Sequence, residues 1–532
     1  MRRIPPVVLL LGPALGAALF LALPGPAGGS SALAQEHAGQ SGERPAGQAE
    51  GDKASPQQRP APDGRRLPVD QITRHTLTLP DRTLAFTATT GTVQLFDGEG
   101  GPLLAEVAAM SFVKDGENPG RRPVAFLFNG GPGAASGYLN VGAVGPWRVP
   151  IEKPAPSDPP VALPNAETWL DFADLVFIDP VGTGYSWTTA RGDEARRRFW
   201  SVDGDISALA TVIRKWIERN GRQASPKILV GESYGGFRAP KVARALQTEQ
   251  GVGVAGLVLL SPVLDFSWRF EDRHSPMRWV SELPSMAAAQ RESVGPDQRG
   301  AVPDLADVED YAAGDYMVDL LRGIQDQAVL ERTSREVARF TGLDLALVRR
   351  LGGRVDTSTF LRERDRAQGL VGSAYDATVT GRDPDPYAAI SRPDDPVLVG
   401  NEAVLSSAMT DLYRRLGWRI DRPYRLLSRE VGNSWQWGGR RMAPEAVSDL
   451  REALALDGRL KALVAHGATD LVTPYFENKL LLRQLPAFPP DRLRLQVYGG
   501  GHMFYSREGS RKAFRADAEA LVKSVTPAAA GE

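Results

Sequence analysis

The first ordered pattern in the chain is an alternation of apolar and polar residues that begins at His75. Its runs are HTLTL, LAFTATTGTVQLF and LLAEVAAMSFV, and Pro-Asp and Asp-Gly pairs separate them. Successive side chains of a strand point to opposite faces, so this alternation is typical of strands with one buried face. We therefore expect antiparallel strands at the start of the folded region.

A second pattern follows, in which apolar runs are continuous and glycine stands at or near their C-terminal ends. The runs are PVAFLFNGG, ADLVFIDPVGTG, KILVGESYGG, GLVLLSPV, KALVAHGATD and LRLQVYGGGH. Continuous apolar runs suit strands that are covered on both faces, and helical patterns such as DISALATVIRKWIERN lie between them. This predicts an α/β fold: a mostly parallel sheet flanked by helices, with the site at the carboxyl ends of the strands.

The rhythm of strands stops between residues 266 and 444. Helical patterns such as VEDYAAGDYMVDLLRGIQ replace it. We predict that 266–444 is a mainly helical cap, inserted between two parts of one core at 71–265 and 445–526.

The N-terminal segment predicts export rather than fold. Arg2 and Arg3 precede an apolar stretch, and Ala-Leu-Ala at 32–34 offers a cleavage site, so 1–34 is interpreted as a signal peptide. A membrane helix is the alternative, but Pro13 and Pro24 favour cleavage. Residues 35–70 are rich in Gly, Pro and Gln and predict a disordered linker. The mature protein is expected to be periplasmic or secreted, without a stable membrane anchor.

Composition narrows the chemistry. The chain has 532 residues with 63 basic and 64 acidic side chains, and this balance gives no electrostatic reason to expect nucleic acid as a partner. It contains no cysteine, which excludes disulfides and thiolate chemistry. Acidic clusters such as Glu309-Asp310 with Asp315 lack metal-ligand spacing with histidine, so we expect no metal and no cofactor.

Ser233 is the candidate nucleophile. It lies in Gly-Glu-Ser-Tyr-Gly (231–235), directly after a predicted strand and before a predicted helix. Small flanking residues allow a strained turn that lifts the hydroxyl clear of the sheet. A glycine-rich turn without chemistry is the alternative, but the strand-turn-helix context favours a nucleophile.

The base that accepts the proton of Ser233 is sought among only five histidines. His37 falls in the linker, His75 in the N-terminal strands and His274 among charges in the cap. His466 still belongs to a strand and is interpreted as a packed side chain. His502 follows three glycines at the end of the last strand, and we predict that it is the base.

Asp470 is the predicted acid that orients His502, because it ends the turn after a strand and gives the chain order Ser, Asp, His. Asp179, at the end of another strand, is the rival acid. The expected oxyanion donors are the backbone NH of Tyr234 and a donor from Asn-Gly-Gly-Pro-Gly at 129–133. A phosphate cradle is the alternative for that loop, but the Lys-Ser/Thr of a P-loop is missing.

Four motifs together resemble the serine carboxypeptidase family of α/β-hydrolases, and in particular its bacterial exported branch. They are NGGPG at 129–133, PVGTGYS at 180–186, GESYGG at 231–236 and GGGHM at 499–503. In order and rough spacing the resemblance covers about residues 91–525, excluding the divergent cap. The resemblance implies an α/β-hydrolase fold and the release of C-terminal residues from peptides through an acyl-enzyme.

The resemblance also implies roles residue by residue. Ser233, His502 and Asp470 are the implied catalytic triad, and the backbone NH groups of Gly131 and Tyr234 are the implied oxyanion donors.

The implied binding site for the carboxylate of the substrate consists of Asn129, Gly130 and Glu232. Two carboxyl groups share a hydrogen bond only if one carries a proton, so we expect one raised carboxyl pKa and a preference for acidic pH.

The chain departs from the family pattern at three positions. Ala143 stands where the resemblance leads us to expect a second glutamate, Leu127 replaces a tryptophan, and Ala134 replaces a cysteine or serine. The missing second acid keeps an esterase or acyltransferase with the same triad open as an alternative. A non-catalytic binding protein on this fold is a third hypothesis. Prolyl aminopeptidase-like enzymes also use a Gly-Gly-Pro-Gly loop, but have histidine in place of Asn129.

Trp435 and Trp437, near the end of the predicted cap, carry two interpretations. They line a pocket for a substrate side chain, or they pack the cap against the core, and the second is favoured.

Overall fold

The computed structural model describes residues 66–152, 155–157, 159–270, 275–294, 301–391, 393–438 and 443–527. The predicted signal peptide, most of the predicted linker, His37 and His274 lie outside the described residues. The chain divides into two compact units, and the fold below is that of the second, Gly64–Glu532.

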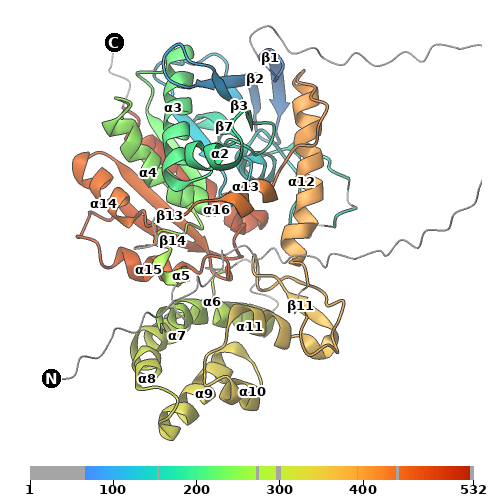
Figure 1. Ribbon diagram of the computed structural model, residues 1–532, viewed down its shortest axis with the longest axis vertical. Coiled ribbons are helices and arrows are strands. Elements are labelled where there is room, and N and C mark those ends of the chain that lie inside the picture. Colours follow the sequence, from blue (N-terminus) through green and yellow to red (C-terminus); the bar gives the residue numbers. More distant parts are fainter. Residues whose placement is uncertain are drawn as a thin grey trace, which may run out of the picture. The chain divides into compact units, whose positions relative to one another are not determined.

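A ten-stranded sheet forms the centre of the described residues (Figure 1). Its order is β1-β2-β3-β7-β4-β9-β10-β13-β14, with β8 paired to β3. The first three strands are antiparallel, as predicted. The remaining strands of this order, β7, β4, β9, β10, β13 and β14, run parallel to one another. The bounds are β1 (Gln71–Thr78), β2 (Thr83–Phe96), β3 (Leu103–Lys114), β4 (Val124–Phe128), β7 (Asp174–Ile178), β8 (Trp187–Thr188), β9 (Lys227–Glu232), β10 (Gly256–Leu260), β13 (Lys461–Gly467) and β14 (Leu493–Tyr498).

Every residue of β4, β7, β9 and β10 is buried, which explains why their sequences are continuously apolar. Neighbouring residues of β9 belong to different hydrophobic clusters: Leu229 packs with α3, α4 and α14, whereas Val230 packs with α12 and α16. Both faces of the sheet are therefore covered. These helices are α3 (Val202–Arg219), α4 (Tyr234–Thr248), α12 (Pro396–Arg415), α14 (Val447–Leu456) and α16 (Glu508–Val525).

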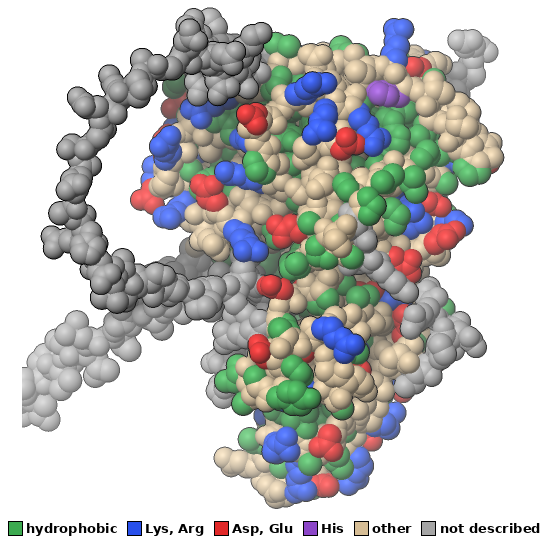
Figure 2. Space-filling view, turned by 90° about the vertical axis from the view of Figure 1, so that its right-hand side faces the viewer, with side chains coloured by type: hydrophobic (Ala, Val, Ile, Leu, Met, Phe, Trp, Pro, Cys, Tyr) green, Lys and Arg blue, Asp and Glu red, His purple; other side chains and the backbone are tan. Residues whose placement is uncertain are grey.

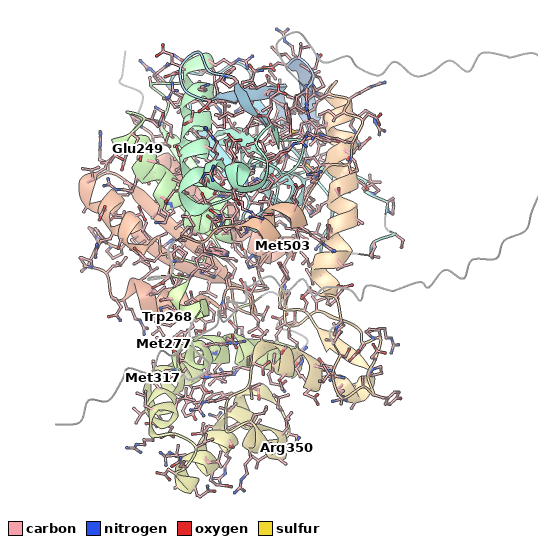
Figure 3. All side chains as sticks on the ribbon, viewed as in Figure 1. Glu249, Trp268, Met277, Met317, Arg350 and Met503 are labelled. Carbon is pink, nitrogen blue, oxygen red and sulfur yellow. The ribbon has the colours of Figure 1, made fainter. Side chains whose placement is uncertain are left out.

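A separate group of helices follows β10 and has its own hydrophobic cluster, which also includes residues just after β13 and from α15 (Tyr475–Leu482). Figure 1 shows the group in green to yellow, and Figure 3 labels Met317 and Arg350 within it. Its members are α6 (Met277–Val294), α7 (Ala306–Tyr311), η4 (Ala312–Tyr316), α8 (Met317–Arg322), α9 (Gln327–Thr341), α10 (Leu345–Arg350) and α11 (Thr357–Glu363).

Shorter elements complete the fold. They are α1 (Gly137–Leu139), η1 (Asn140–Val144), β5 (Trp147–Arg148), β6 (Leu163–Pro164), η2 (Trp169–Asp171), α2 (Gly192–Arg198), α5 (Ser267–Phe270), η5 (Arg366–Gln368), β11 (Leu370–Gly372), β12 (Thr380–Arg382), α13 (Arg429–Ser434) and η6 (Phe504–Ser506).

Two predicted boundaries differ from the structure. Leu67 is buried and its backbone NH donates to Glu106, so the folded part begins before residue 71. Helix α12 was expected in the cap at 266–444, but its apolar side chains Val404, Leu405 and Leu412 pack in the core beside the sheet. Helical periodicity shows which face of a helix is apolar, but not which layer that face covers.

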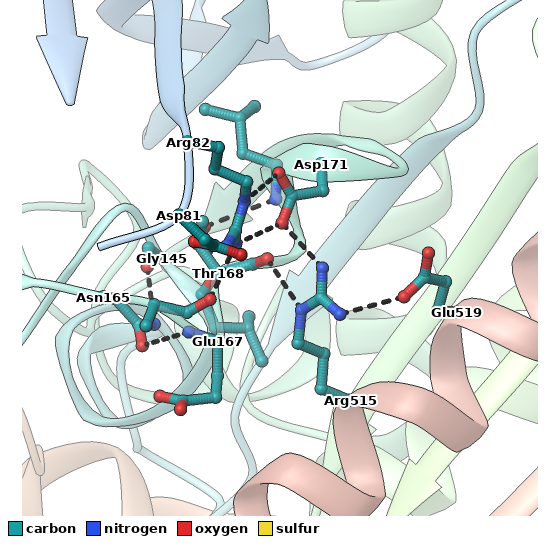
Figure 4. A network of polar contacts seen from close by, with 12 residues as sticks. Asp81, Arg82, Gly145, Asn165, Glu167, Thr168, Asp171, Arg515 and Glu519 are labelled. Atoms are coloured by element: carbon teal, nitrogen blue, oxygen red, sulfur yellow. Dashed lines mark hydrogen bonds and ion pairs between the residues drawn. The ribbon is translucent and has the colours of Figure 1, made fainter. Parts of the chain in front are cut away.

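Polar contacts connect the turn between β1 and β2 to α16. Asp171 accepts hydrogen bonds from Arg82 at 2.9 and 2.6 Å and from Arg515 of α16 at 2.6 Å (Figure 4). Arg515 also pairs with Glu519 at 2.9 Å. Because these side chains are partly exposed, we expect a small contribution to stability from each pair, on the order of 1 kcal/mol or less.

Acidic and basic side chains are interspersed on the face shown in Figure 2. This agrees with the balanced composition and offers no field of one sign on that face. Among the described residues, no helix combines the length and the apolarity needed to cross a membrane.

The placement of α12 in the core predicts a contrast in stability between two leucines. Leu412 is 3% exposed in the core cluster, whereas Leu321 on α8 is 70% exposed. Leu412→Ala should lower the free energy of unfolding by ~2–5 kcal/mol, and Leu321→Ala by less than ~0.5 kcal/mol. Urea denaturation of both variants measures this, and equal losses would contradict the assignment of α12 to the core.

Candidate active site

The turn at Ser233 has the predicted strained backbone. Ser233 lies between β9 and α4 with φ 61° and ψ −124°, in a region that non-glycine residues rarely adopt. Its NH donates to the carbonyl of Leu260 at 2.8 Å, which fixes the turn against β10. A Cβ atom at Gly231 would lie 2.0 Å from the carbonyl oxygen of Gly235, so the sharp turn requires glycine there. Ser233 keeps partial exposure while its neighbours are buried.

Asp470 and His502 form a buried pair. The His502 Nδ1 lies 2.9 Å from the Asp470 Oδ2, and the two residues are 4% and 0% exposed. Asp470 also accepts backbone hydrogen bonds from Val472 and Thr473, at 2.8 and 2.9 Å. The Thr473 hydroxyl lies 2.6 Å from Asp470 Oδ2 and 3.1 Å from His502 Nδ1. Asp470 is thus held in place on both of its oxygens.

Asp470 is held in its ionised form. Burial raises its pKa, but the charge of His502 and hydrogen bonds from His502 and Thr473 outweigh burial, so the pKa lies below its usual value. An ionised Asp470 fixes the Nδ1–H tautomer of His502 and leaves Nε2 to accept a proton.

His502 is positioned from three sides. Its backbone NH donates to the carbonyl of Tyr375, and its carbonyl accepts from the Ser261 hydroxyl at 2.9 Å. The Tyr375 ring meets the imidazole edge-on, with centroids 5.3 Å apart. These contacts come from the residue after β10 and from the segment after β11, so His502 is held by the core and by the inserted region together.

The candidate residues gather because β9, β10, β13 and β14 are parallel neighbours, whose carboxyl ends meet at one edge of the sheet. Ser233 follows β9, Asp470 follows β13 and His502 follows β14. Met503, beside His502, is labelled in Figure 3 where the sheet meets the inserted region.

The other candidates of the sequence lie elsewhere. Asp179 accepts hydrogen bonds from the backbone and hydroxyl of Ser136 at 2.9 and 2.8 Å and from Tyr424 at 2.9 Å, so it ties together three chain segments. His466 is fully buried within β13 and contacts Asn478 at 2.9 Å. His75 stacks on Phe86 in the N-terminal strands.

The loop at 129–133 lies against the serine turn. A Cβ atom at Gly130 would lie 2.5 Å from the amide nitrogen of Tyr234, so only glycine allows this close approach. Gly131 has a φ of +95°, another conformation that favours glycine. The loop is therefore built to bring backbone groups beside the turn. The roles of Gly131 and Tyr234 as oxyanion donors stay a prediction.

Glu232, beside Ser233, is a buried carboxyl group whose hydrogen-bond donors in the described part of the chain are neutral. Asn129 Nδ2 donates to its Oε2 at 2.6 Å, and the Tyr505 hydroxyl lies 2.9 and 3.0 Å from its two oxygens. Burial raises its pKa to about 7, against the lowering effects of the His502 charge and of the bonds from Tyr505 and Asn129. Near neutral pH this carboxyl group is thus able to hold a proton.

Comparison with known proteins finds one family whose model matches part of the chain. Residues 110–266 match the model of the serine carboxypeptidase family. This part of the chain is similar to serine carboxypeptidases.

Curated proteins that are similar to part of this chain include serine carboxypeptidase-like 20 of Arabidopsis thaliana, which is 30% identical over 137 residues. Another is the pheromone-processing carboxypeptidase KEX1 of Metarhizium robertsii, 33% identical over 132 residues. The matches take up 25% and 24% of this chain, and they span 26% and 19% of those relatives. The predicted likeness to the bacterial branch stays a prediction.

A solved structure supports the fold over a longer range. The crystal structure of Kex1(delta)p, a prohormone-processing carboxypeptidase from Saccharomyces cerevisiae, has a TM-score of 0.52 and 13% identity. The match covers 82% of this chain and 91% of that chain. The predicted α/β-hydrolase fold is confirmed.

One departure from the serine carboxypeptidase pattern, Ala143, lies in the segment next to Tyr505. Ala143 is buried in η1, and its carbonyl accepts from Asn165 at 2.9 Å. Trp435 and Trp437 pack edge-on against Tyr234, at 5.3 and 5.6 Å between ring centroids. The interpretation of these tryptophans as packing residues agrees with the contacts. Among the described residues, no cluster of His, Asp and Glu is arranged to hold a metal ion.

Sequence reasoning missed three residues of this site: Thr473, Tyr375 and Tyr505. Thr473 follows Asp470 by three residues and Tyr505 follows His502 by three, so both belong to the turns that carry the predicted residues. That spacing is the signal that was available for these two. Tyr375 comes from the inserted region, and no local pattern points to it.

The geometry predicts different effects for two equally buried aspartates. Asp470→Asn should lower turnover of a p-nitrophenyl ester by a factor of about 10⁴, because the imidazole loses its orienting acceptor. Asp179→Asn should change turnover by less than about tenfold and should lower thermal stability instead. Steady-state kinetics and thermal melts measure both. A tenfold or smaller loss for Asp470→Asn would exclude it as the orienting acid.

Proposed function

We propose that this protein is a serine carboxypeptidase that releases C-terminal residues from peptides through an acyl-enzyme. The observation that carries the proposal is Glu232: a buried carboxyl group with a pKa near 7, next to the serine on the strained turn. A general acyl hydrolase needs no such group, whereas recognition of a free carboxylate does. The match of residues 110–266 to the model of the serine carboxypeptidase family adds support.

The proposed reaction begins with attack of Ser233 Oγ on the carbonyl carbon of the last peptide bond. His502 Nε2 takes the hydroxyl proton, and Asp470 stabilises the imidazolium that forms. The backbone NH groups of Gly131 and Tyr234 would stabilise the oxyanion. His502 then gives the proton to the nitrogen of the leaving amino acid, the C–N bond breaks, and the peptide remains as an ester on Ser233. Water, activated by His502, hydrolyses this ester and restores the serine.

The carboxylate of the substrate would bind at Glu232, with Asn129 and the backbone at Gly130 beside it. If Glu232 carries a proton, it donates a hydrogen bond to the substrate carboxylate and avoids repulsion between two negative charges. The short reach from Glu232 to Ser233, which are adjacent residues, suits a substrate whose carboxylate lies one residue beyond the cleaved bond.

An esterase or acyltransferase with the same triad is the second candidate. The observation that favours it is Ala143, which supplies no second acid to the carboxylate site. The third hypothesis, a binding protein without catalysis, leaves the strained serine turn and the Asp470–His502 pair without a use.

We further propose that the substrates are peptides with a free C-terminus and that the protein is exported to the periplasm or secreted. Support for export comes from the N-terminal pattern of Arg2, Arg3 and the apolar stretch after them. No cofactor takes part in the proposed mechanism.

Three matched substrates separate the candidates: an N-blocked dipeptide, its C-terminal amide, and a p-nitrophenyl ester. We expect kcat/KM for the dipeptide to exceed that for the amide at least about tenfold at acidic pH, because only the free acid pairs with Glu232. Ser233→Ala, the control, should abolish cleavage of all three. Cleavage of the ester alone would contradict the carboxypeptidase proposal and favour the esterase.

The preference for the free acid should depend on pH. Because Glu232 donates only when protonated, the ratio of kcat/KM for acid over amide should be constant below its pKa and fall about tenfold per pH unit above pH 7. Glutamine cannot titrate, so in Glu232→Gln the ratio should be independent of pH. A ratio that falls in the same way in both proteins would assign the titration to another group.

A further inference from the structure

Tyr505 is fixed in place by the turn that follows His502. It is fully buried in η6, its carbonyl accepts from Arg511 at 3.0 Å, and its ring lies 5.9 Å from that of Phe504. Phe504 in turn stacks on Tyr498, with centroids 4.9 Å apart. The phenol therefore reaches Glu232 from a well-packed turn, and this turn follows the candidate base His502 in the chain.

The contacts of Glu232 distinguish its two oxygens. Leu139 NH donates to Asn129 Oδ1 at 3.2 Å, which turns Nδ2 of the same amide toward Glu232 Oε2. Since Oε2 accepts from this amide, the proton of a neutral Glu232 sits on Oε1. The Tyr505 hydroxyl lies 2.9 Å from Oε1 and 3.0 Å from Oε2, within donating distance of both oxygens.

We propose that Tyr505 is a positioning residue for the carboxylate site: its phenol holds Glu232 so that Oε1 presents the proton to the carboxylate of the substrate. The inference rests on the proposed function and deepens it, because it identifies the residue that sets the selectivity for a free C-terminus. Catalytic attack by Ser233 does not require the phenol.

Tyr505 also stands beside the segment that lacks a second acid. A Cβ atom at Gly142 would lie 3.8 Å from the ring of Tyr505, and Ala143 is the next residue. A neutral phenol here supports Glu232 without the shared proton that a second carboxyl group requires. The chain thus has a donor in this region although position 143 offers none.

The titration of Glu232 involves groups on several elements. Its pKa responds to His502 after β14, to Asp470 after β13 and to Tyr505 on η6, while Asn129 from the loop after β4 is neutral. Glu232 in turn contributes to the raised pKa values of Tyr138 on α1 and of Tyr375, which burial raises most. Of these groups, Tyr505 and Asn129 hydrogen-bond the carboxyl directly.

Tyr505→Phe tests the proposal, because it removes one hydroxyl and keeps the ring. We expect the ratio of kcat/KM for the N-blocked dipeptide over its amide to fall about tenfold at acidic pH, as Glu232 loses its positioning donor. We also expect the alkaline fall of that ratio to move to higher pH, because the lost donor had stabilised the ionised form. Ester turnover should change by less than about threefold, since the triad is untouched.

Tyr498→Phe is the matched control, because Tyr498 is also buried and donates to a carboxylate, Asp517, at 2.6 Å. It should leave both the ratio and its pH dependence unchanged. In the Glu232→Gln background, Tyr505→Phe should cause no pH shift.

Three results would overturn the proposal. The first is a Tyr505→Phe protein with the wild-type ratio and pH profile. The second is an equal loss of kcat/KM on acid, amide and ester at every pH. The third is a Tyr505→Phe protein that unfolds where Tyr498→Phe does not. Either of these two results would make Tyr505 a purely structural residue. A wild-type enzyme that cleaves only the ester would contradict the proposed function, and this inference with it. The assay of the wild-type protein alone identifies that outcome, so it is distinguished from a failure of this inference.

Discussion

Two buried carboxyl groups beside one imidazole must hold opposite protonation states for this site to work as proposed. Asp470 has a lowered pKa because His502 and the donors around Thr473 outweigh its burial. Glu232 is equally enclosed, but its direct donors are a neutral amide and a phenol, and burial raises its pKa to about 7. In the proposed mechanism this separation of the two pKa values suits Asp470 to orienting the base and Glu232 to binding the substrate carboxylate.

The parallel sheet makes this separation possible. Glu232 is the last residue of β9 and Asp470 follows β13, with β10 between these two strands. Asp470 therefore meets the imidazole directly, whereas Glu232 points to the loop at 129–133 and to η6. Ser233 follows Glu232 on the strained turn after β9, at the edge of the sheet where Asp470 and His502 also follow their strands.

Local chemistry in the sequence was sufficient to predict the catalytic candidates. Ser233, Asp470 and His502 each follow a strand of the parallel sheet, and the glycine-rich turns around them leave a clear pattern. Tyr505 was not predicted because its role depends on which side chain the turn after His502 brings to Glu232, and spacing alone does not determine that. Tyr375 was missed for a stronger reason, since it arrives from the inserted region, more than a hundred residues away from Ser233.

The layer that each helix covers was harder to predict than its presence. Helix α12 is amphipathic in a way that suits either a cap or a core, and the packing of its residues Val404, Leu405 and Leu412 in the core cluster places it beside the sheet. The start of the folded part was also hard to predict. Leu67 is buried and its backbone NH donates to the side chain of Glu106, a contact that no local signal encodes.

The protonation of Glu232 is the central claim, and infrared difference spectroscopy of wild type against Glu232→Gln measures it without any substrate. The account predicts a protonated-carboxyl band that is present at acidic pH and disappears with a midpoint near pH 7. A band that disappears at the ordinary pKa of glutamate, about 4.3, would contradict it, because Glu232 would then face a substrate carboxylate as a second negative charge.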